Sequence, residues 1–504
     1  MQFSVYTFGC KLNQLETEAV TDAFSQAGFT FVPWSTVQRH SAPLALMVIN
    51  TCTVTSMADQ KARRFIRKLL NCYPDMCLIV TGCYAQVEQE AIAALESGAV
   101  PRRLFVVPGE RKDRLLTLPP LLSGKEKAAI PVLLDAWFAS LSSSAPGTNV
   151  SNSNESDGSF SFQPERFASH SRALLKVQDG CDRRCAFCRV SIARGKSRSR
   201  RAEEALAALK SLENRKFSEV VISGVNITQY WDPGFKFDRL NFDRLKFDLG
   251  ALLDFFLANT ESVRLRLSSL EPDWLSQANL SASTGVFTNP RVRPHFHLSV
   301  QSGSDTIIKK MNRSYTKADI ENAVSFFRSV RADPFIACDI IAGFPGETEA
   351  DFEETFALCR HLRFAWIHAF PFSARPGTAA AGFPDKVSER EASRRVERLT
   401  ELAAACRREY IERWQGREVE AVVQAGKETS AHTPGMIAAV SENYLKLLVS
   451  CGGAEVPAPG SLIRCRIGGC ITSENSRFDA TAELSSVAGI CAAEEISPHS
   501  LKAS

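Results

Sequence analysis

Three cysteines near the middle of the chain have the spacing C-x-x-x-C-x-x-C. These core cysteines are Cys181, Cys185 and Cys188, and they follow a predicted strand, Ala173–Val177. Three thiolates on one short loop can hold three irons of a [4Fe–4S] cluster, because such clusters take one cysteine for each iron. The fourth iron then has no protein ligand and can bind a small molecule. A tetrahedral zinc site would need a fourth ligand, and neither Cys nor His stands nearby.

Three further cysteines, far apart in the sequence, each follow a predicted strand of the first hundred residues. These N-terminal cysteines are Cys10, Cys52 and Cys83, after the strands Phe3–Thr7, Leu44–Ile49 and Cys77–Thr81. In a parallel sheet the carboxyl ends of the strands share one edge, where doubly wound folds bind ligands. We therefore expect the three thiols to converge in space. On spacing alone, scattered structural cysteines are an equally open alternative.

The composition is that of a globular protein with about three domains. The 504 residues are 44% hydrophobic and 23% charged, and 60 Lys and Arg against 56 Asp and Glu leave a net charge of +4. Bulk charge therefore identifies no partner. No apolar run approaches the roughly 20 residues of a membrane helix, and the N-terminus does not resemble a secretory signal. We expect a cytoplasmic protein without a membrane partner, whose fifteen cysteines serve metal or redox chemistry.

Alternating strands and helices must position these cysteines. The first hundred residues predict a doubly wound parallel sheet. Six β/α units follow from Ala173 and predict a partial (β/α)6 barrel of the TIM type, whose reactive groups belong at the carboxyl ends of the strands. The last region predicts a small all-β barrel, because its short strands are separated by Gly, Pro and Asn. The expected fold class is a multidomain α/β protein.

The predicted domains follow from these patterns and from two low-complexity segments. Ser140–Ser161 is rich in Ser, Asn and Gly, which predicts a flexible linker. Phe235–Asp248 is a short imperfect repeat and predicts an inserted loop. The predicted boundaries are 1–125 for the sheet domain, 126–166 for the linker, 167–400 for the half-barrel, 401–414 for a connecting helix, 415–486 for the small barrel and 487–504 for a tail.

Short motifs along the chain match, in order, the signatures of a known family. The N-terminal motifs are TFGCKLNQLETE, VINTCTVT and TGCYAQ. The central motifs are GCDRRCAFCRV, ISGVNITQY, RLSSLEP, HLSVQSGSDTIIKKMNR, DIIAGFPGETEADFEET and HAFPFSARPGT. Over roughly residues 1–486, apart from the two low-complexity segments, the chain resembles the radical S-adenosylmethionine (SAM) methylthiotransferase family. Its C-terminal barrel is similar to a TRAM domain, an RNA-binding module.

The resemblance implies catalytic roles for both sets of cysteines. The core cysteines would hold a [4Fe–4S] cluster whose open iron binds SAM, and cleavage of this SAM would give a radical that activates a C–H bond. The N-terminal cysteines would hold a second [4Fe–4S] cluster that supplies sulfur, and another SAM would supply the methyl group. The net reaction inserts a CH3–S group. The implied partners are tRNA, an electron donor of the flavodoxin or ferredoxin type, and a sulfur donor.

Three branches of this family differ in substrate: threonylcarbamoyladenosine in tRNA, isopentenyladenosine in tRNA, or an aspartate of a ribosomal protein. GCKLNQLETE, with Lys11 after the first cysteine, most resembles the first branch, as do ARGKSRSR and FPFSARPGTAA. We therefore expect methylthiolation at C2 of N6-threonylcarbamoyladenosine at position 37, beside the anticodon. The other two substrates are alternatives with the same chemistry. A non-catalytic iron–sulfur protein that binds RNA is an alternative of a different class.

Several residues of the core motif or of predicted strand ends are candidates for contacts with SAM. They are Phe187, Ser223, Gly224, Glu271, Gln301, Ser302 and Gly343. For Gly224 an ordinary turn is the alternative. Arg375, after the sixth strand, could contact substrate or the SAM carboxylate, or could structure its own loop.

Eight cations and no acid occupy residues 183–201, beside the core cysteines. Such a loop would attract the phosphates of tRNA, and a solvated basic loop is the alternative. The candidate nucleic-acid contacts are Arg194, Lys196, Arg198 and Arg200, with Arg417, Arg464 and Arg466 of the C-terminal barrel. The chain departs from the family at Arg189, Val190 and Ser191, where a hydrophobic residue and Val-Pro are usual. We expect this departure to alter loop stiffness or substrate contact.

Overall fold

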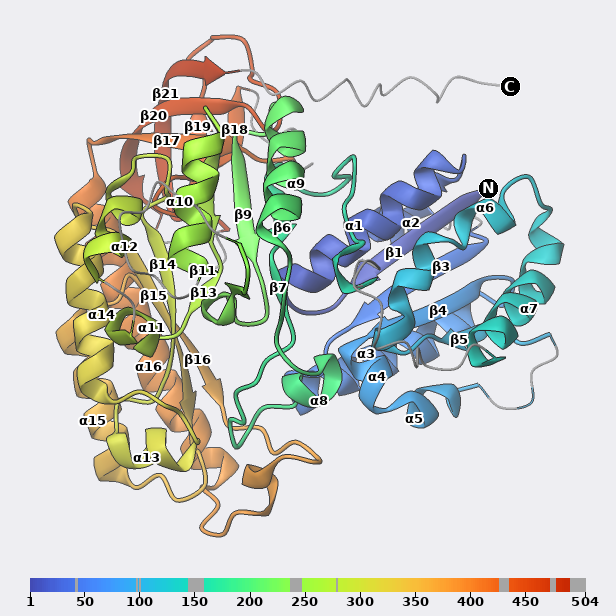
Figure 1. The fold of residues 1–504 in the computed structure, drawn as a ribbon, viewed down its shortest axis with the longest axis horizontal. Coiled ribbons are helices and arrows are strands. Elements are labelled where there is room, and N and C mark those ends of the chain that lie inside the picture. Colours follow the sequence, from blue (N-terminus) through green and yellow to red (C-terminus); the bar gives the residue numbers. More distant parts are fainter. Residues whose placement is uncertain are drawn as a thin grey trace.

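The computed structural model describes residues 1–40, 44–96, 98, 101–143, 158–235, 247–277, 280–425, 435–471 and 477–489. Along the sequence, an N-terminal α/β domain is followed by a half-barrel and a closed β-barrel (Figure 1), as the predicted fold class requires. Most of the predicted repeat and tail, and part of the linker, lie outside the described residues. Within the described ranges, no helix is both long and apolar enough to cross a membrane.

The N-terminal domain is a five-stranded sheet, wholly parallel, in the order β2-β1-β3-β4-β5. Helix α1 packs on one face of the sheet and α3 on the other, so the domain is doubly wound. The strand order reverses between β1 and β3, and ligands of such folds bind at the carboxyl ends beside that reversal. The strands are β1 (Gln2–Thr7), β2 (Thr30–Phe31), β3 (Leu46–Thr51), β4 (Cys77–Gly82) and β5 (Leu104–Val106). The helices are α1 (Lys11–Gln26), α2 (Trp34–His40), α3 (Ser56–Cys72), α4 (Cys83–Val87) and α5 (Gln89–Ala93).

The predicted linker, 126–166, begins too early. Within it, α7 (Ile130–Ser143) places Ile130, Leu134 and Trp137 in the same hydrophobic core as β1 and α1. Phe162 joins that core from the far end of the range. The apolar side chains of α7 hold it on the sheet domain, which therefore extends past residue 125.

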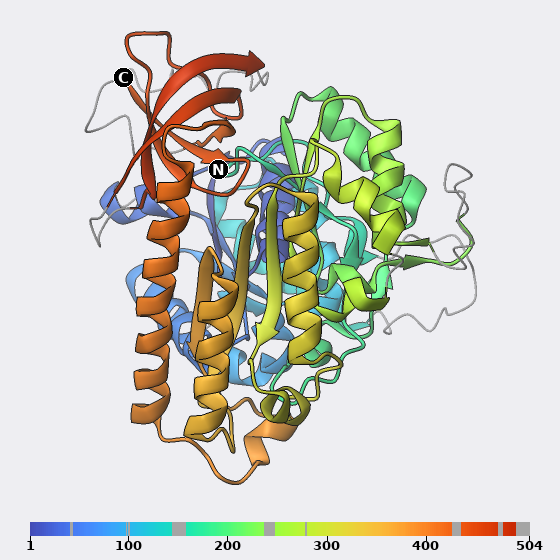
Figure 2. The same cartoon turned by 90° about the vertical axis from the view of Figure 1, so that its left-hand side faces the viewer.

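The central domain is a half-barrel of two parallel sheets, with strand orders β12-β9-β6 and β13-β14-β15-β16. The third predicted strand, Val263–Ser268, corresponds to β12, and β13 follows it directly in the other sheet. Helices cover the outer face (Figure 2). The strands are β6 (Ala173–Lys176), β9 (Glu219–Ser223), β12 (Arg264–Leu267), β13 (Ser269–Leu270), β14 (His295–Gln301), β15 (Phe335–Ala342) and β16 (Trp366–Pro371). The helices are α9 (Ala202–Asn214), α10 (Leu249–Asn259), α11 (Asp273–Gln277), α12 (Leu280–Thr288), α13 (Asp305–Lys310), α14 (Lys317–Val330) and α15 (Glu349–Leu362).

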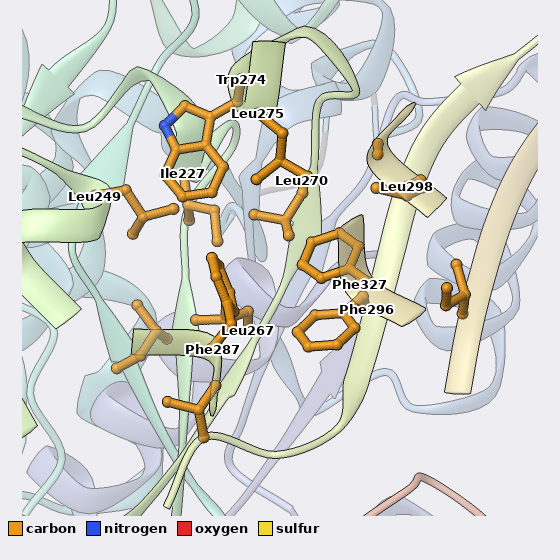
Figure 3. Close-up of a cluster of buried hydrophobic side chains, with 14 of the residues drawn as sticks. Ile227, Leu249, Leu267, Leu270, Trp274, Leu275, Phe287, Phe296, Leu298 and Phe327 are labelled. Atoms are coloured by element: carbon orange, nitrogen blue, oxygen red, sulfur yellow. The ribbon is translucent and has the colours of Figure 1, made fainter. Parts of the chain in front are cut away.

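Alternate residues of β14 face two different environments. Phe296 points outward and stacks on Phe327 of α14, with ring centroids 3.8 Å apart (Figure 3). His297 faces the inside of the half-barrel, where its Nε2 lies 3.0 Å from the Asp339 carboxylate of β15. Because side chains alternate across a strand, the outward face builds the core and the inward face stays polar.

The C-terminal barrel follows the long helix α16 (Glu389–Trp414), which packs along β16 and matches the helical pattern of Ser388–Trp414 in the sequence. Its strands close in the order β17-β18-β19-β21-β20. The sequence predicted the other four strands and missed β18, whose alanines carry a weak strand signal. The strands are β17 (Glu418–Val423), β18 (Met436–Ser441), β19 (Lys446–Ser450), β20 (Leu462–Cys470) and β21 (Ala480–Gly489).

A buried ion cluster joins this barrel to the half-barrel. Glu219 accepts hydrogen bonds from Arg266 at 2.6 and 2.9 Å and from Arg293 at 2.9 Å. Arg266 also donates to the Glu442 carbonyl, and Arg293 to the Glu420 carboxylate. Burial acts to raise the pKa of Glu219, but the two guanidinium groups outweigh burial and hold the pKa well below its usual range.

Replacing this carboxylate with an amide, Glu219→Gln, leaves two buried cations without their shared counter-charge. We expect the free energy of unfolding, measured by urea denaturation, to fall by about 3–5 kcal/mol. The matched control is Glu418→Gln on β17, whose side chain is exposed. That change should lower the free energy of unfolding by no more than about 0.5 kcal/mol. Equal decreases in the free energy of unfolding for the two variants would show that the ion cluster does not stabilise the contact between the barrel and the half-barrel.

Candidate active site

The N-terminal cysteines lie at one edge of the first sheet. Cys10 is the N-cap residue of α1 just beyond β1, Cys52 directly follows β3, and Cys83 begins α4 directly after β4. The backbone at Gly9 (φ 101°) lies close to Cys52: a Cβ at Gly9 would be only 2.5 Å from the Cβ of Cys52. Burial raises the pKa of the Cys52 thiol to about 12, and the neighbouring Cys10 and Cys83 also act to raise it. The structure thus places the three cysteines at the strand-order reversal.

This donor set fits an iron–sulfur cluster. A thiol with so high a pKa stays protonated at neutral pH unless a metal replaces the proton. In the described part of the chain, no group of three or more His, Cys, Asp or Glu side chains could hold a single metal ion. A single metal ion needs all its ligand atoms within bonding distance of one point. The cysteines of a four-iron cluster can lie farther apart, since each cysteine binds its own iron.

The core cysteines occupy the loop after β6 and the short strand β7 (Gln178–Asp179). All three are half-buried, and the Val190 N–H donates to the Cys188 sulfur at 3.4 Å. Beside the loop, the Asn226 backbone N–H donates to Gln178 at 2.8 Å. The Asn226 side chain bonds to the Cys181 thiol and acts to lower its pKa, whereas burial has the larger effect and raises it. A side-chain hydrogen bond to one of three half-buried thiols on one short loop fits cysteines that bind an iron–sulfur cluster, because such clusters accept hydrogen bonds at their sulfur ligands.

Arg313 is a candidate that sequence analysis missed. Its guanidinium donates to the Cys185 sulfur at 3.0 Å and to the Ser299 carbonyl at 3.1 Å, and it pairs with Glu271. Glu271, predicted to contact SAM, is 8% exposed and holds this arginine in place. Arg313 lies in the KMNR end of a family motif, and nothing in the local spacing linked it to a cysteine more than one hundred residues away.

Three of the predicted SAM contacts are accessible near the core cysteines. Phe187 is half-buried and its ring lies 6.5 Å from Phe344. Gly224 is half-buried beside Gln178. Gln301 ends β14 with a φ of 63°, an uncommon conformation for a residue other than glycine. These three stay predictions.

The other three candidates have structural roles. The Ser223 hydroxyl is buried and donates to the Val221 carbonyl at 3.2 Å, and the Ser302 hydroxyl bonds to Thr355 at 3.2 Å. Gly343 has a φ of 79°, and a Cβ there would lie 2.5 Å from the Cβ of Ala392 on α16. Gly343 therefore permits close helix packing, and both hydroxyls are already bonded within the protein. Contacts of these three residues with SAM stay predictions.

The basic loop is divided between the surface and the interior. Lys196 and Arg198 are exposed, whereas Arg200 and Arg194 are buried. Burial also lowers the pKa of Arg200. The predicted phosphate contact is wrong for these two buried arginines, because their side chains are packed inside the protein. The sequence alone did not distinguish the buried residues from the exposed ones, because all four lie in one run of cations.

Arg194 instead reaches into the N-terminal domain. Its guanidinium donates to Glu16 at 3.0 Å, to Asn13 at 2.7 Å and to Asp179 at 3.1 Å. Its Nε also donates to the Cys83 sulfur at 3.3 Å. Arg194 therefore connects the loop of the core cysteines with one of the N-terminal cysteines.

Helix packing places the two sets of cysteines on opposite sides of the same interface. α8 (Val190–Arg194) begins two residues after Cys188, and it packs against α4, which begins at Cys83. A helix of five residues spans roughly 7 Å, so one short helix and the Arg194 side chain separate Cys188 from Cys83. A cavity of about 530 Å³ opens beside Cys83 and Arg194.

Two more arginines of the central domain hold the N-terminal domain in place. Arg375 is buried, donates to the Thr53 hydroxyl at 2.7 Å and pairs with Asp59. Arg189, in the segment that departs from the family, donates to Glu88 at 2.9 Å. Of the two roles predicted for Arg375, the structure shows the structural one, and it acts between domains.

Known proteins resemble this chain over most of its length. Two family models match: the Radical SAM superfamily over residues 175–359, and Uncharacterized protein family UPF0004 over residues 2–100. Threonylcarbamoyladenosine tRNA methylthiotransferase MtaB of Treponema pallidum (strain Nichols) is 40% identical, over 92% of this chain and 97% of that protein. A tRNA-2-methylthio-N(6)-dimethylallyladenosine synthase of Jannaschia sp. (strain CCS1) is 31% identical, over 87% of this chain and 86% of that protein.

Among solved structures, the radical SAM methyltransferase TsrM of Kitasatospora setae matches with a TM-score of 0.45 and 14% identity, over 75% of this chain and 76% of that one. A likeness at that level carries no argument about function. The sequence similarity does carry an argument about function, because it includes both matched domains. It gives the chain SAM and a [4Fe–4S] cluster as cofactors. This chain belongs to the radical SAM methylthiotransferase family, as its motifs predicted.

Proposed function

We propose that this protein methylthiolates tRNA at C2 of N6-threonylcarbamoyladenosine, at position 37. The observation that carries the proposal is the higher similarity to the relative named for threonylcarbamoyladenosine, 40% identity, than to the relative named for dimethylallyladenosine, 31%. In this proposal the core cysteines hold the SAM-binding cluster and the N-terminal cysteines hold a second [4Fe–4S] cluster.

The residues of the chain orient both sites. When bound, the clusters and SAM supply the sulfur, the methyl group and the radical that opens the C–H bond. Arg313 holds the Cys185 sulfur and Arg194 holds the Cys83 sulfur, each by a hydrogen bond from a buried guanidinium. Because α4 packs on α8, a base held at this interface lies within reach of both sites.

The inward face of the half-barrel offers planar side chains that could hold a base. His368 and Phe370 of β16 are exposed and their rings are stacked 6.4 Å apart. His297 stacks on His368 at 5.3 Å, and the Trp366 indole donates to His368 at 3.1 Å. Stacking on such rings is the usual way in which proteins bind a base taken out of an RNA stack.

Lys11, next to Cys10, favours the threonylcarbamoyl substrate. In the described ranges, no carboxylate pairs with its ammonium group. Burial lowers the pKa of Lys11, Tyr444 opposes that effect, and the cations Arg172 and Arg266 lower the pKa further. The threonyl group of the substrate carries a carboxylate, which an isopentenyl group lacks. Such a carboxylate would supply the missing counter-charge through a charge-assisted hydrogen bond.

Exposed cations support tRNA as the macromolecular partner. Lys196, Arg198, Arg417, Arg464 and Arg466 are all exposed, the last three on the C-terminal barrel and its approach. Lys and Arg on a surface neutralise RNA phosphates in a salt-dependent way. The proposal also includes a flavodoxin- or ferredoxin-type electron donor, a sulfur donor, and a cytoplasmic location, where tRNA substrates are found.

Nucleoside mass spectrometry of total tRNA tests the reaction. Deletion of the gene should remove 2-methylthio-threonylcarbamoyladenosine and let its parent accumulate, and the wild-type gene should reverse both changes. Loss of only methylthio-isopentenyladenosine would show that the substrate is wrong. No change in either nucleoside would favour the ribosomal-protein target or a non-catalytic RNA-binding protein.

Cysteine variants test the division of labour between the two sites. Cys185→Ala should abolish both SAM cleavage and product. Cys52→Ala should abolish the methylthio product and leave some uncoupled SAM cleavage, because the core site is intact. Cys72→Ala, at the exposed end of α3, is the control and should behave like wild type. Loss of SAM cleavage in Cys52→Ala would contradict the assignment.

Lys11→Met tests the substrate preference. Removing a hydrogen bond between charged groups costs about 1.5–3 kcal/mol, so we expect kcat/KM for threonylcarbamoyladenosine tRNA to fall by about tenfold or more. Iron content should stay at the wild-type level. The control is Lys61→Met, an exposed lysine of α3, which should leave kcat/KM unchanged. The same kcat/KM in both variants would remove Lys11 from substrate recognition.

A further inference from the structure

Arg194 makes an unusual contact between two domains. It belongs to the loop of the core cysteines, six residues after Cys188, and it is 8% exposed. Its Nε donates to the sulfur of Cys83, which lies in the other domain. The family assignment explains the cysteine but gives no role to a buried arginine on its sulfur.

The surroundings of Arg194 are a buried cluster of cations and carboxylates beside that sulfur. Two buried carboxylates, Glu16 and Asp179, face three buried cations, because Lys112 pairs with Glu16 and Lys176 with Asp179. Burial acts to raise the pKa of Glu16, but Arg194, Lys112 and Lys176 outweigh it and lower the pKa to about 2. The pKa of Asp179 is lowered as well, so both carboxylates are ionised at neutral pH, whereas burial lowers the pKa of Lys176. Arg194 is the cation that donates directly to Cys83.

A hydrogen bond from a guanidinium to a cluster ligand has a defined electronic effect. Reduction adds an electron to the cluster, and a nearby cation stabilises that negative charge strongly in a buried, poorly solvated site. Hydrogen bonds to the sulfur ligands are among the factors that set the potentials of iron–sulfur clusters. The donor on Cys83 would therefore make the reduced state easier to reach.

We propose that Arg194 is a positioning residue of the N-terminal site, which raises the reduction potential of the cluster there through its hydrogen bond to Cys83. The inference rests on the proposed function, since it takes the N-terminal cysteines to hold a [4Fe–4S] cluster. It also makes the central domain responsible for the redox properties of a cluster bound in the neighbouring domain.

The test uses the full chain with only the N-terminal site intact, in the background Cys181→Ala, Cys185→Ala and Cys188→Ala. After anaerobic reconstitution, the midpoint potential is measured by redox titration followed by electron paramagnetic resonance. Arg194→Gln should shift the midpoint to a more negative potential. Arg189→Gln is the matched control: it removes another arginine of the same loop, which pairs with Glu88 rather than with a thiol, and should not shift the midpoint.

Two further variants guard against simple misfolding. Arg194→Lys keeps a cation at this place but cannot reproduce all the hydrogen bonds of the guanidinium, so we expect a smaller negative shift. The double variant Arg194→Gln with Glu16→Gln removes one cation and one carboxylate together, which preserves the charge balance and removes the hydrogen bond. A negative shift in this double variant supports the role of the hydrogen bond.

Iron content separates the possible failures. The triple cysteine background should bind about four irons per chain, as one four-iron cluster requires. If that background binds no iron, the second cluster of the proposed function is overturned and this inference with it. If it binds four irons and neither the single nor the double Arg194 variant shifts the midpoint, the proposed function stands and only the role of Arg194 is overturned.

Discussion

The Arg194 guanidinium makes the interaction on which the geometry of both cysteine sets depends. A buried charge is costly unless it is paired and hydrogen-bonded, and Arg194 meets that requirement with Glu16 and Asn13 of one domain and Asp179 of its own. The contacts with Glu16 and Asn13 can form only when the Arg194 end of α8 reaches α1, and its contact with Cys83 only when α8 lies against α4. The position of the core loop is thereby tied to Cys83, and neither cysteine set can move far without leaving buried charges unpaired.

The same physical arrangement recurs at the other domain boundaries. The central domain supplies cations, and its neighbours supply carboxylates or carbonyls: Arg375 pairs with Asp59 at one side of the N-terminal domain, and Arg266 donates to the Glu442 carbonyl of the C-terminal barrel. A half-barrel does not close on itself, and in the structure the N-terminal domain lies beside it (Figure 1). The ion pairs therefore serve to hold an open barrel against the domain that shares its active site.

Local sequence predicted the elements well and the tertiary contacts poorly. β17 (Glu418–Val423) and the strands before the N-terminal cysteines follow from apolar runs bounded by turns. The role of Arg194 could not be predicted, because in the sequence it is one of eight neighbouring cations, and its partners Glu16 and Asn13 lie more than 170 residues away. The packing role of Gly343 could not be predicted for a similar reason: its closeness to Ala392 of α16 exists only in the folded chain.

The central claim is that two iron–sulfur sites, one from each domain, lie on opposite sides of one interface. Electron paramagnetic resonance of the fully reduced, reconstituted wild-type protein tests it most directly. Two clusters separated by one five-residue helix, roughly 7 Å long, and one arginine side chain should couple magnetically and broaden or split the signal. A wild-type spectrum that equals the sum of the spectra of the two single-site variants would contradict the claim.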